Sequence, residues 1–197
     1  RQDAIQITKA KRYDGKLTLL FVGRMEREKG VYLILDALKK MSAGEKARLG
    51  CMQFVGNGAD LEVIKQQAET TGVPCVFHGS MGRDALNRLY AESHYLLLPS
   101  MASEGFPKVL AEASAFGCLP VVSAISSITQ YIETGKNGFV LEACTTDALY
   151  QMLVKIQLLN TVDTLIHEAR EMVRLFTYER YNERISNEIF GLTQAEN

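Results

Sequence analysis

The stretch Leu17-Thr-Leu-Leu-Phe-Val-Gly23 decides the fold, because five of its seven residues are large and apolar and the last is glycine. A continuous apolar run of this kind predicts a strand that is buried on both faces, as the strands of parallel sheets are. Apolar residues between Leu33 and Met41 then recur at helical spacing. The first unit of the chain is therefore a buried strand followed by an amphipathic helix.

The same alternation continues along the chain. Further strands are predicted at 51–55, 74–77, 95–98, 119–123 and 139–141, helices at 61–68, 85–91 and 108–116, and a helical turn at 128–133. Six short strands separated by helices indicate an α/β fold, a Rossmann-like doubly wound parallel sheet. Ligands of such sheets bind beyond the carboxyl ends of the strands, so the functional residues are expected in the segments that follow them.

The ends of the chain differ from this central part. Residues 1–16 are polar and are expected to form a linker or edge segment, and the Rossmann-like domain is expected to span 17–160. From Thr146 onward the pattern is helical, at 147–159, 162–175 and 178–192, so residues 161–197 are expected to form C-terminal helices. Residue 1 is arginine, which favours a domain fragment or a processed chain.

Composition excludes several classes of protein. The chain has 197 residues, 47% of them apolar and 23% charged, which are values of a globular domain. Its formal net charge of −1 provides no basic field for a nucleic acid, and no apolar run is long enough to span a membrane. The four cysteines have no metal or redox spacing, so we expect small buried side chains in a reducing, cytoplasmic compartment.

The segment after the first strand carries cations between two glycines. Arg24 and Lys29 lie on the turn from Gly23 to Gly30, which leads into a helix. Guanidinium and ammonium groups beside a helix N-terminus form an anion site, most naturally for phosphate. The alternative is a solvated loop of mixed charge.

The segment after the second strand begins like a dinucleotide fingerprint. Gly56-Asn57-Gly58 is followed by Leu61 at the sixth position, and no acidic residue stands about twenty positions further on. Nicotinamide cofactor binding is therefore not expected. The glycines instead favour a tight turn or a close backbone approach to a ligand.

The segment after the fourth strand contains two glutamates. Glu104 lies in the loop, and Glu112 lies within a helix that is otherwise almost entirely apolar. Burying an unpaired carboxylate is costly, so Glu112 is expected to face the ligand-binding end of this helix. The alternatives are an exposed loop acid at Glu104 and a satisfied structural acid at Glu112.

In this order the motifs resemble the C-terminal, nucleotide-sugar-binding domain of retaining glycosyltransferases of family 4, which have the GT-B fold. The resemblance covers nearly all of residues 17–160. The motifs are Gly23-Arg24-x4-Lys29-Gly30, Gly56-x-Gly58, Phe77-x-Gly79, Glu104-Gly105-Phe106-x5-Glu112-Ala113, Gly117-x-x-Pro120-Val121-Val122 and Gly135-Lys136-Asn137-Gly138-Phe139.

The resemblance implies a role for each segment. Arg24 and Lys29 would neutralise the diphosphate leaving group, Glu104 would hold hydroxyls of the donor sugar, and Glu112 would accept hydrogen bonds from the ribose diol. The main chain of residues 106–109 would contact sugar and phosphate, and that of residues 78–81 would contact the base. The expected catalytic residues are Arg24, Lys29 and Glu104, and the expected substrate-binding residues are Gly23, Gly56, His78, Ser80, Met81, Gly105, Phe106, Pro107, Lys108, Val109 and Glu112.

The implied function is the transfer of a sugar, with retention, from a nucleoside diphosphate sugar to an acceptor. The chain has no Asp-x-Asp motif, so we expect neither a metal nor a cofactor. The acceptor, a glycan, a lipid-linked glycan or a small molecule, would bind an N-terminal domain that is absent here, and this piece alone would be inactive. Through that domain the protein would reach a membrane surface. The alternatives are a non-hydrolysing nucleotide-sugar epimerase and a non-catalytic nucleotide-sugar-binding module.

Some positions depart from the resembled pattern. Pro107 stands where the family often has glycine, Ser126-Ser127 replace a Gly-Gly pair, and Gln130 replaces a glutamate. These changes leave the identity of the sugar open. The last predicted helix, 178–192, carries an apolar face that would pack on the absent domain in the resembled fold.

Overall fold

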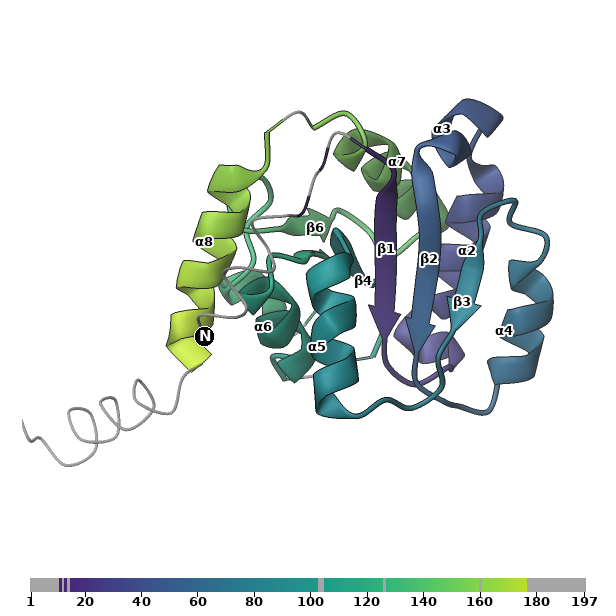
Figure 1. The fold of residues 1–197 in the computed structure, drawn as a ribbon, viewed down its shortest axis with the longest axis horizontal. Coiled ribbons are helices and arrows are strands. Elements are labelled where there is room, and N and C mark those ends of the chain that lie inside the picture. Colours follow the sequence, from purple (N-terminus) through teal and green to yellow (C-terminus); the bar gives the residue numbers. More distant parts are fainter. Residues whose placement is uncertain are drawn as a thin grey trace, which may run out of the picture.

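Six parallel strands form one sheet at the centre of the computed structural model, which describes residues 11, 13, 15–102, 105–125, 127–159 and 161–176 (Figure 1). The order of the strands across the sheet is β3-β2-β1-β4-β5-β6. This is the strand order of the Rossmann fold, so the predicted doubly wound sheet is confirmed. The strands are β1 (Leu17–Val22), β2 (Leu49–Val55), β3 (Cys75–Phe77), β4 (Tyr95–Leu98), β5 (Leu119–Ser123) and β6 (Phe139–Leu141).

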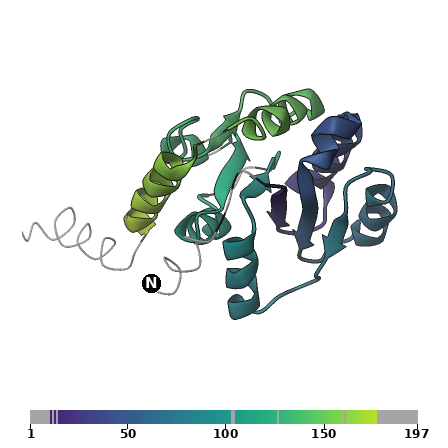
Figure 2. The same cartoon turned by 45° about the horizontal axis from the view of Figure 1, so that its top comes forward.

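Helices cover the two faces of the sheet (Figures 1 and 2). One face carries α2 (Val31–Lys40), α4 (Leu61–Ala68) and α7 (Thr146–Ile156), and the other carries α5 (Arg83–Glu92), α6 (Lys108–Ala115) and α8 (Asp163–Val173). The remaining elements are α3 (Ala43–Ala47) and the 3-10 turns η1 (Arg27–Lys29), η2 (Ile128–Gln130) and η3 (Arg174–Phe176).

The central strands are buried on both faces, as their apolar runs predict. Consecutive residues Leu19, Leu20 and Phe21 of β1 are completely buried. Each side chain of this size contributes about 1.5–3 kcal/mol when it is removed from water. The edge strand β3 is less covered, and Val76 in its middle is 41% exposed. The best-packed part of the sheet is therefore its centre, β1 and β4. The loops that follow these two strands begin at well-packed residues.

The short helix α3 was not predicted, although its start carries a recognisable signal. The Ser42 hydroxyl accepts a hydrogen bond from the Glu45 N–H (3.4 Å), and the Glu45 carboxylate accepts one from the Ser42 N–H (2.7 Å). This is a capping box, and it corresponds to the Ser-x-x-Glu pattern in the sequence. The helix buries no residue, so hydrophobic periodicity could not reveal it.

The two described residues before Gly15 are docked on the domain. The Lys11 ammonium donates hydrogen bonds to the main-chain oxygens of Tyr90, Ser93 and Phe116 (3.1, 2.5 and 3.2 Å). The Tyr13 hydroxyl lies within hydrogen-bond distance of the His94 and Gly117 oxygens (3.2 and 2.9 Å), which share its one proton. These oxygens lie at or just beyond the C-terminal ends of α5 and α6, where a helix favours a cation. Lys11 and Tyr13 therefore tie two helices together.

At the other end, the core continues beyond residue 160. Helix α8 packs against α6 and buries Ala169 and Met172. The predicted helix at 178–192 lies outside the described residues. Within the described ranges, no helix combines the length and the apolar character that crossing a membrane would require.

The cysteines are less buried than expected. All four are free thiols, and Cys118 is buried, whereas Cys51, Cys75 and Cys144 are partly exposed. Two of these three, Cys51 and Cys75, lie on β2 and on the edge strand β3, where the sheet is least covered.

Candidate functional site

The loops after β1 and β4 meet at the point where the winding of the sheet reverses. These strands are neighbours, and their connections lead to opposite sides of the sheet, to β2 and to β5. The Glu28 carbonyl oxygen, after β1, accepts hydrogen bonds from the Met101 N–H (2.8 Å) and the Ser100 hydroxyl (3.2 Å), after β4. The carboxyl edge at such a switch point is the usual ligand site of an open α/β sheet.

Gly30 allows this close contact. It precedes α2 in the left-handed region, with φ of +76°, and a Cβ atom built there would lie 1.9 Å from the Pro99 carbonyl oxygen. A residue with a side chain would therefore be strained and would also collide with the end of the β4 loop. The glycine brings the start of α2 against this loop.

The two cations of the sequence prediction lie on the β1 side of this junction. Arg24 is 65% exposed and forms an ion pair with Glu26, with 3.3 Å between Nη1 and Oε1. Exposed ion pairs contribute little stability, so this guanidinium can exchange Glu26 for a ligand at small cost. Lys29 is half-buried at the end of η1, directly before Gly30. Gly23 continues the sheet, because its N–H donates to the Val55 oxygen (3.0 Å).

The start of α6 contributes main-chain donors on the β4 side. Pro107 occupies the N-cap position, and no side chain caps the helix. Proline has no N–H to offer, so donors come from the first turn, where Lys108 is exposed and Val109 is half-buried. An uncapped helix start carries partial positive charge and binds anions. The predicted cradle at residues 106–109 thus has the local structure that an anion needs.

The loops after β2 and β3 are bonded to each other on the same edge of the sheet. The Gly56 N–H donates to the Gly79 oxygen (2.7 Å), and the Asn57 amide donates to the Ser80 hydroxyl (3.0 Å). Gly56 has φ of +127°, and a Cβ there would lie 1.9 Å from the Gly23 oxygen. The close backbone approach at Gly56 is therefore made to the end of β1, and the predicted approach to a ligand stays a prediction. Sequence reasoning missed the Asn57–Ser80 contact, which no pattern signals.

His78 follows β3 and already has a partner. Its Nε2 lies 2.9 Å from the buried Gln53 Oε1, and its main-chain N–H donates to Phe54. This arrangement is that of a satisfied edge histidine. The exposed Ser80 and the half-buried Met81, both expected near a base, continue the same loop. His94 is buried, and its Nδ1 accepts a hydrogen bond from the Thr18 N–H (2.9 Å), so its role is structural.

Glu112 is half-buried on α6 and accepts a hydrogen bond from a buried tyrosine. The Tyr90 hydroxyl, on α5, lies 3.2 Å from Glu112 Oε2. Burial raises the pKa of Tyr90, and the negative charge of Glu112 raises it further, so the hydroxyl stays protonated and donates. A protein donor to Glu112 is what the alternative, a satisfied structural acid, predicts, and the expectation that Glu112 faces a ligand stays a prediction. Sequence reasoning missed Tyr90 as the donor to Glu112, because in the sequence it is one of several residues on the apolar face of a helix.

The loop with the other glutamate is only partly described. Glu104 and Ser126 lie outside the described residues, so their roles stay predictions. Gly105 is exposed, and the Phe106 ring stacks on Phe176 of η3, with centroids 4.0 Å apart and 9° between the planes. The side chain of Phe106 therefore packs η3 against this loop. Its main chain lies directly before Pro107, the N-cap residue of α6.

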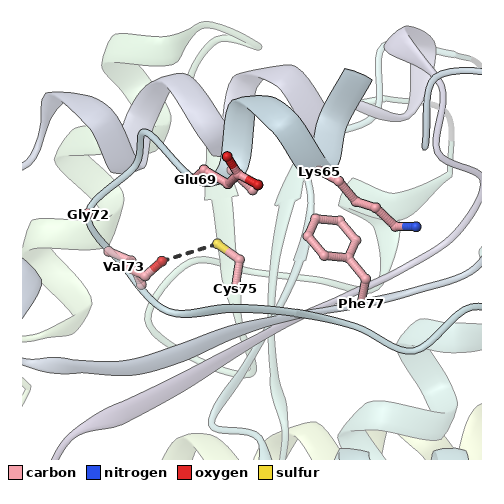
Figure 3. A pocket seen from close by; sticks show the side chains of 7 residues that line it. Lys65, Glu69, Gly72, Val73, Cys75 and Phe77 are labelled. Atoms are coloured by element: carbon pink, nitrogen blue, oxygen red, sulfur yellow. Dashed lines mark hydrogen bonds between the residues drawn. The ribbon is translucent and has the colours of Figure 1, made fainter. Parts of the chain in front are cut away.

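Two cavities lie away from this junction. One of about 270 Å³ is formed by α4 and β3 and is lined by Lys65, Glu69, Cys75 and Phe77, among others (Figure 3). Burial raises the pKa of the Cys75 thiol, which donates to the Val73 oxygen (3.3 Å), so it is not an activated nucleophile. The other, of about 410 Å³, lies between α7 and the end of β6. Over the described ranges, no group of three or more His, Cys, Asp or Glu side chains could hold a metal.

Comparison with known families identifies the chain. The family model described as glycosyl transferases group 1 matches residues 3–172. The chain belongs to the glycosyl transferases of group 1. The prediction of a glycosyltransferase is thereby confirmed at the level of the family. The matched residues include the loops after β1 and β4, helix α6 and Glu112.

Relatives in this family carry out different sugar transfers according to their names. The sulfoquinovosyl transferase SQD2 of Arabidopsis thaliana is 28% identical over an alignment of 181 residues, which covers 89% of this chain and 34% of that protein. The lipopolysaccharide 1,2-N-acetylglucosaminetransferase of Salmonella typhimurium is 24% identical over an alignment of 172 residues, which covers 83% of this chain and 44% of that protein. The chain spans less than half the length of these relatives.

Solved glycosyltransferase structures share the fold. The Anabaena protein Alr3699/HepE, crystallised in complex with UDP, superposes with a TM-score of 0.77 at 20% identity, covering 97% of this chain and 53% of that one. This similarity, together with the parallel six-stranded sheet, confirms the predicted Rossmann-like half of a GT-B glycosyltransferase fold.

Proposed function

We propose that this chain is the donor-binding half of a retaining, metal-independent glycosyltransferase of family 4, which transfers a sugar from a nucleoside diphosphate sugar to an acceptor. The observation that carries the proposal is the junction of the β1 and β4 loops. It gathers Arg24, Lys29 and the uncapped start of α6 around one edge of the sheet.

The chemistry of the transfer fits this junction. When the bond between sugar and phosphate breaks, negative charge grows on the diphosphate that leaves. Preorganised cations and main-chain N–H donors stabilise such developing charge without reorganising. Arg24 and Lys29 supply cations, and α6 supplies donors and the positive end of its dipole. These groups can stabilise the leaving group without a metal ion.

The remaining residues take the roles that the resemblance to the family implies. Glu112 accepts hydrogen bonds from the ribose diol, and Glu104 holds hydroxyls of the donor sugar. The main chain at residues 78–81 meets the base, on the same edge of the sheet. Support for a uridine nucleotide comes from the Anabaena neighbour, which has also been crystallised with UDP and glucose and with UDP-glucose.

The lengths of the relatives support a two-domain enzyme. The chain corresponds to about half of the Anabaena structure and to less than half of the Arabidopsis and Salmonella relatives. We assign it to the C-terminal lobe of the GT-B fold, with an acceptor-binding lobe in the remainder of the enzyme.

Calorimetric titration with UDP and UMP tests the proposed phosphate site. Charge-assisted hydrogen bonds contribute about 1.5–3 kcal/mol each, so UDP is expected to bind at least about tenfold tighter than UMP. Arg24→Gln and Lys29→Gln should each reduce this ratio. Lys65→Gln is the matched control, because Lys65 pairs with Glu62 on the surface of α4. Equal affinity for UDP and UMP in the unaltered chain would overturn the proposal.

A further inference from the structure

The hydrogen bond between α5 and α6 gives Tyr90 a part in recognising the donor. We propose that Tyr90 is a positioning residue, which orients the Glu112 carboxylate toward the ribose of the nucleotide. This inference rests on the proposed function, in which Glu112 accepts from the ribose diol. The observation that carries it is the 3.2 Å contact between the Tyr90 hydroxyl and Glu112 Oε2.

The packing around Tyr90 fixes its side chain independently of Glu112. Its side chain is completely buried on α5, and its ring lies against Phe116, with centroids 6.3 Å apart and 21° between the planes. Its main-chain oxygen accepts a hydrogen bond from Lys11 (3.1 Å). The hydroxyl therefore has a fixed position, and the more mobile partner in the contact is the carboxylate.

Glu112 depends on that fixed donor. It is half-buried on a helix whose neighbouring residues Leu110, Ala113 and Ser114 are buried. In the part of the chain that the structure describes, the Tyr90 hydroxyl donates a hydrogen bond to the Glu112 side chain. A tyrosine hydroxyl occupies one carboxylate oxygen and leaves the second as an acceptor. Without the hydroxyl, the glutamate side chain regains rotamer freedom, which a bound ribose must then remove.

A comparison of two ligands isolates this role. UDP carries both ribose hydroxyls, and 2′,3′-dideoxy-UDP carries neither. Calorimetry on the 197-residue chain gives the ratio of the two dissociation constants. Tyr90→Phe should lower the preference for UDP about three- to tenfold, the range expected for one net hydrogen bond. Both ligands bind the same folded fraction, so a loss of stability does not alter the ratio.

Two further variants provide the matched controls. Tyr95→Phe removes an equally buried hydroxyl, which donates to the Ile156 oxygen (3.5 Å), and should leave the ratio unchanged. Glu112→Gln should lower the ratio by itself. The double variant of Tyr90 and Glu112 should match Glu112→Gln, because the tyrosine acts through the glutamate.

The outcomes separate the two proposals. If Tyr90→Phe weakens UDP and dideoxy-UDP equally while Glu112→Gln lowers the ratio, the tyrosine is only structural, and the positioning role is overturned while the ribose site stands. Independent, multiplying effects of the two substitutions would also overturn it. If Glu112→Gln leaves the ratio intact, the ribose site itself is wrong and the role of Tyr90 falls with it.

Discussion

Because Gly30 has no side chain, the β1 and β4 loops can approach each other closely. Gly30→Ala places a Cβ against the Pro99 carbonyl and forces alanine into the left-handed region. The strain alone costs about 1–2 kcal/mol, so a total loss of at least about 2 kcal/mol in the free energy of unfolding is expected. Urea denaturation would measure it.

Gly44→Ala is the control for this prediction. Gly44 lies inside α3 with open space around it, and alanine is the better helix former, so this change should stabilise the chain by about 0.5–1 kcal/mol. Similar free energies of unfolding for the two variants would contradict the contact that we describe at Gly30.

At the residue scale, the sequence predicted which residue types would gather but not the contacts that hold them. Arg24 and Lys29 were recognisable because they are cations on a turn that follows a buried strand. The contact of Gly30 with Pro99 and the bond of Tyr90 to Glu112 join residues 69 and 22 positions apart along the chain. Such contacts depend on how the loops and helices pack, and no local pattern encodes them.

At the scale of elements, Lys11 connects α5 to α6, and its burial lowers the free energy of unfolding by an amount that depends on pH. Burial lowers the pKa of its ammonium from 10.5 to about 8, a shift that nearby Cys118 opposes and Arg170 adds to. Between about pH 8 and 10.5 the unfolded chain holds more protons on this amine than the folded chain does. The free energy of unfolding due to Lys11 therefore rises with pH across this window, by about 3 kcal/mol.

Comparison with Lys11→Met isolates this contribution. Burial also raises the pKa of the Cys118 thiol to about 12, which acts in the opposite direction above pH 9, but this thiol is present in both proteins. The stability of the unaltered chain relative to Lys11→Met should increase from pH 7 to pH 10 in urea denaturation. A difference that stays constant over this range would contradict the burial of a charged amine.

The elements themselves were largely predictable because their signals are local. All six strands were anticipated within two residues, since each is a buried apolar run. The anchoring of Lys11 and Tyr13 was not, because polar residues ahead of the first strand resemble a linker. Their partners lie 79 to 105 positions away.

At the scale of the whole molecule, we expect this chain to bind a donor without transferring its sugar. The proposed site is an open edge of one sheet, and transfer requires an acceptor site and the exclusion of water, which a second lobe would provide. Calorimetry should detect binding of UDP-glucose, and an assay with radiolabelled sugar should detect no product with candidate acceptors. Sustained transfer by residues 1–197 alone would disprove the two-lobe proposal.

The three carbonyl oxygens that accept hydrogen bonds from Lys11 also determine where the boundary of this lobe can be placed when it is expressed alone or fused to another protein. A fragment that begins at Leu17 contains all strands of the described sheet. It lacks the Lys11 ammonium at these three oxygens and the Tyr13 hydroxyl at the His94 and Gly117 oxygens, of which His94 keeps the Leu119 N–H as a donor. A boundary placed before residue 11 retains both anchors. If the other lobe precedes this chain, these anchors would place the flexible part of the amino-terminal connection before Lys11.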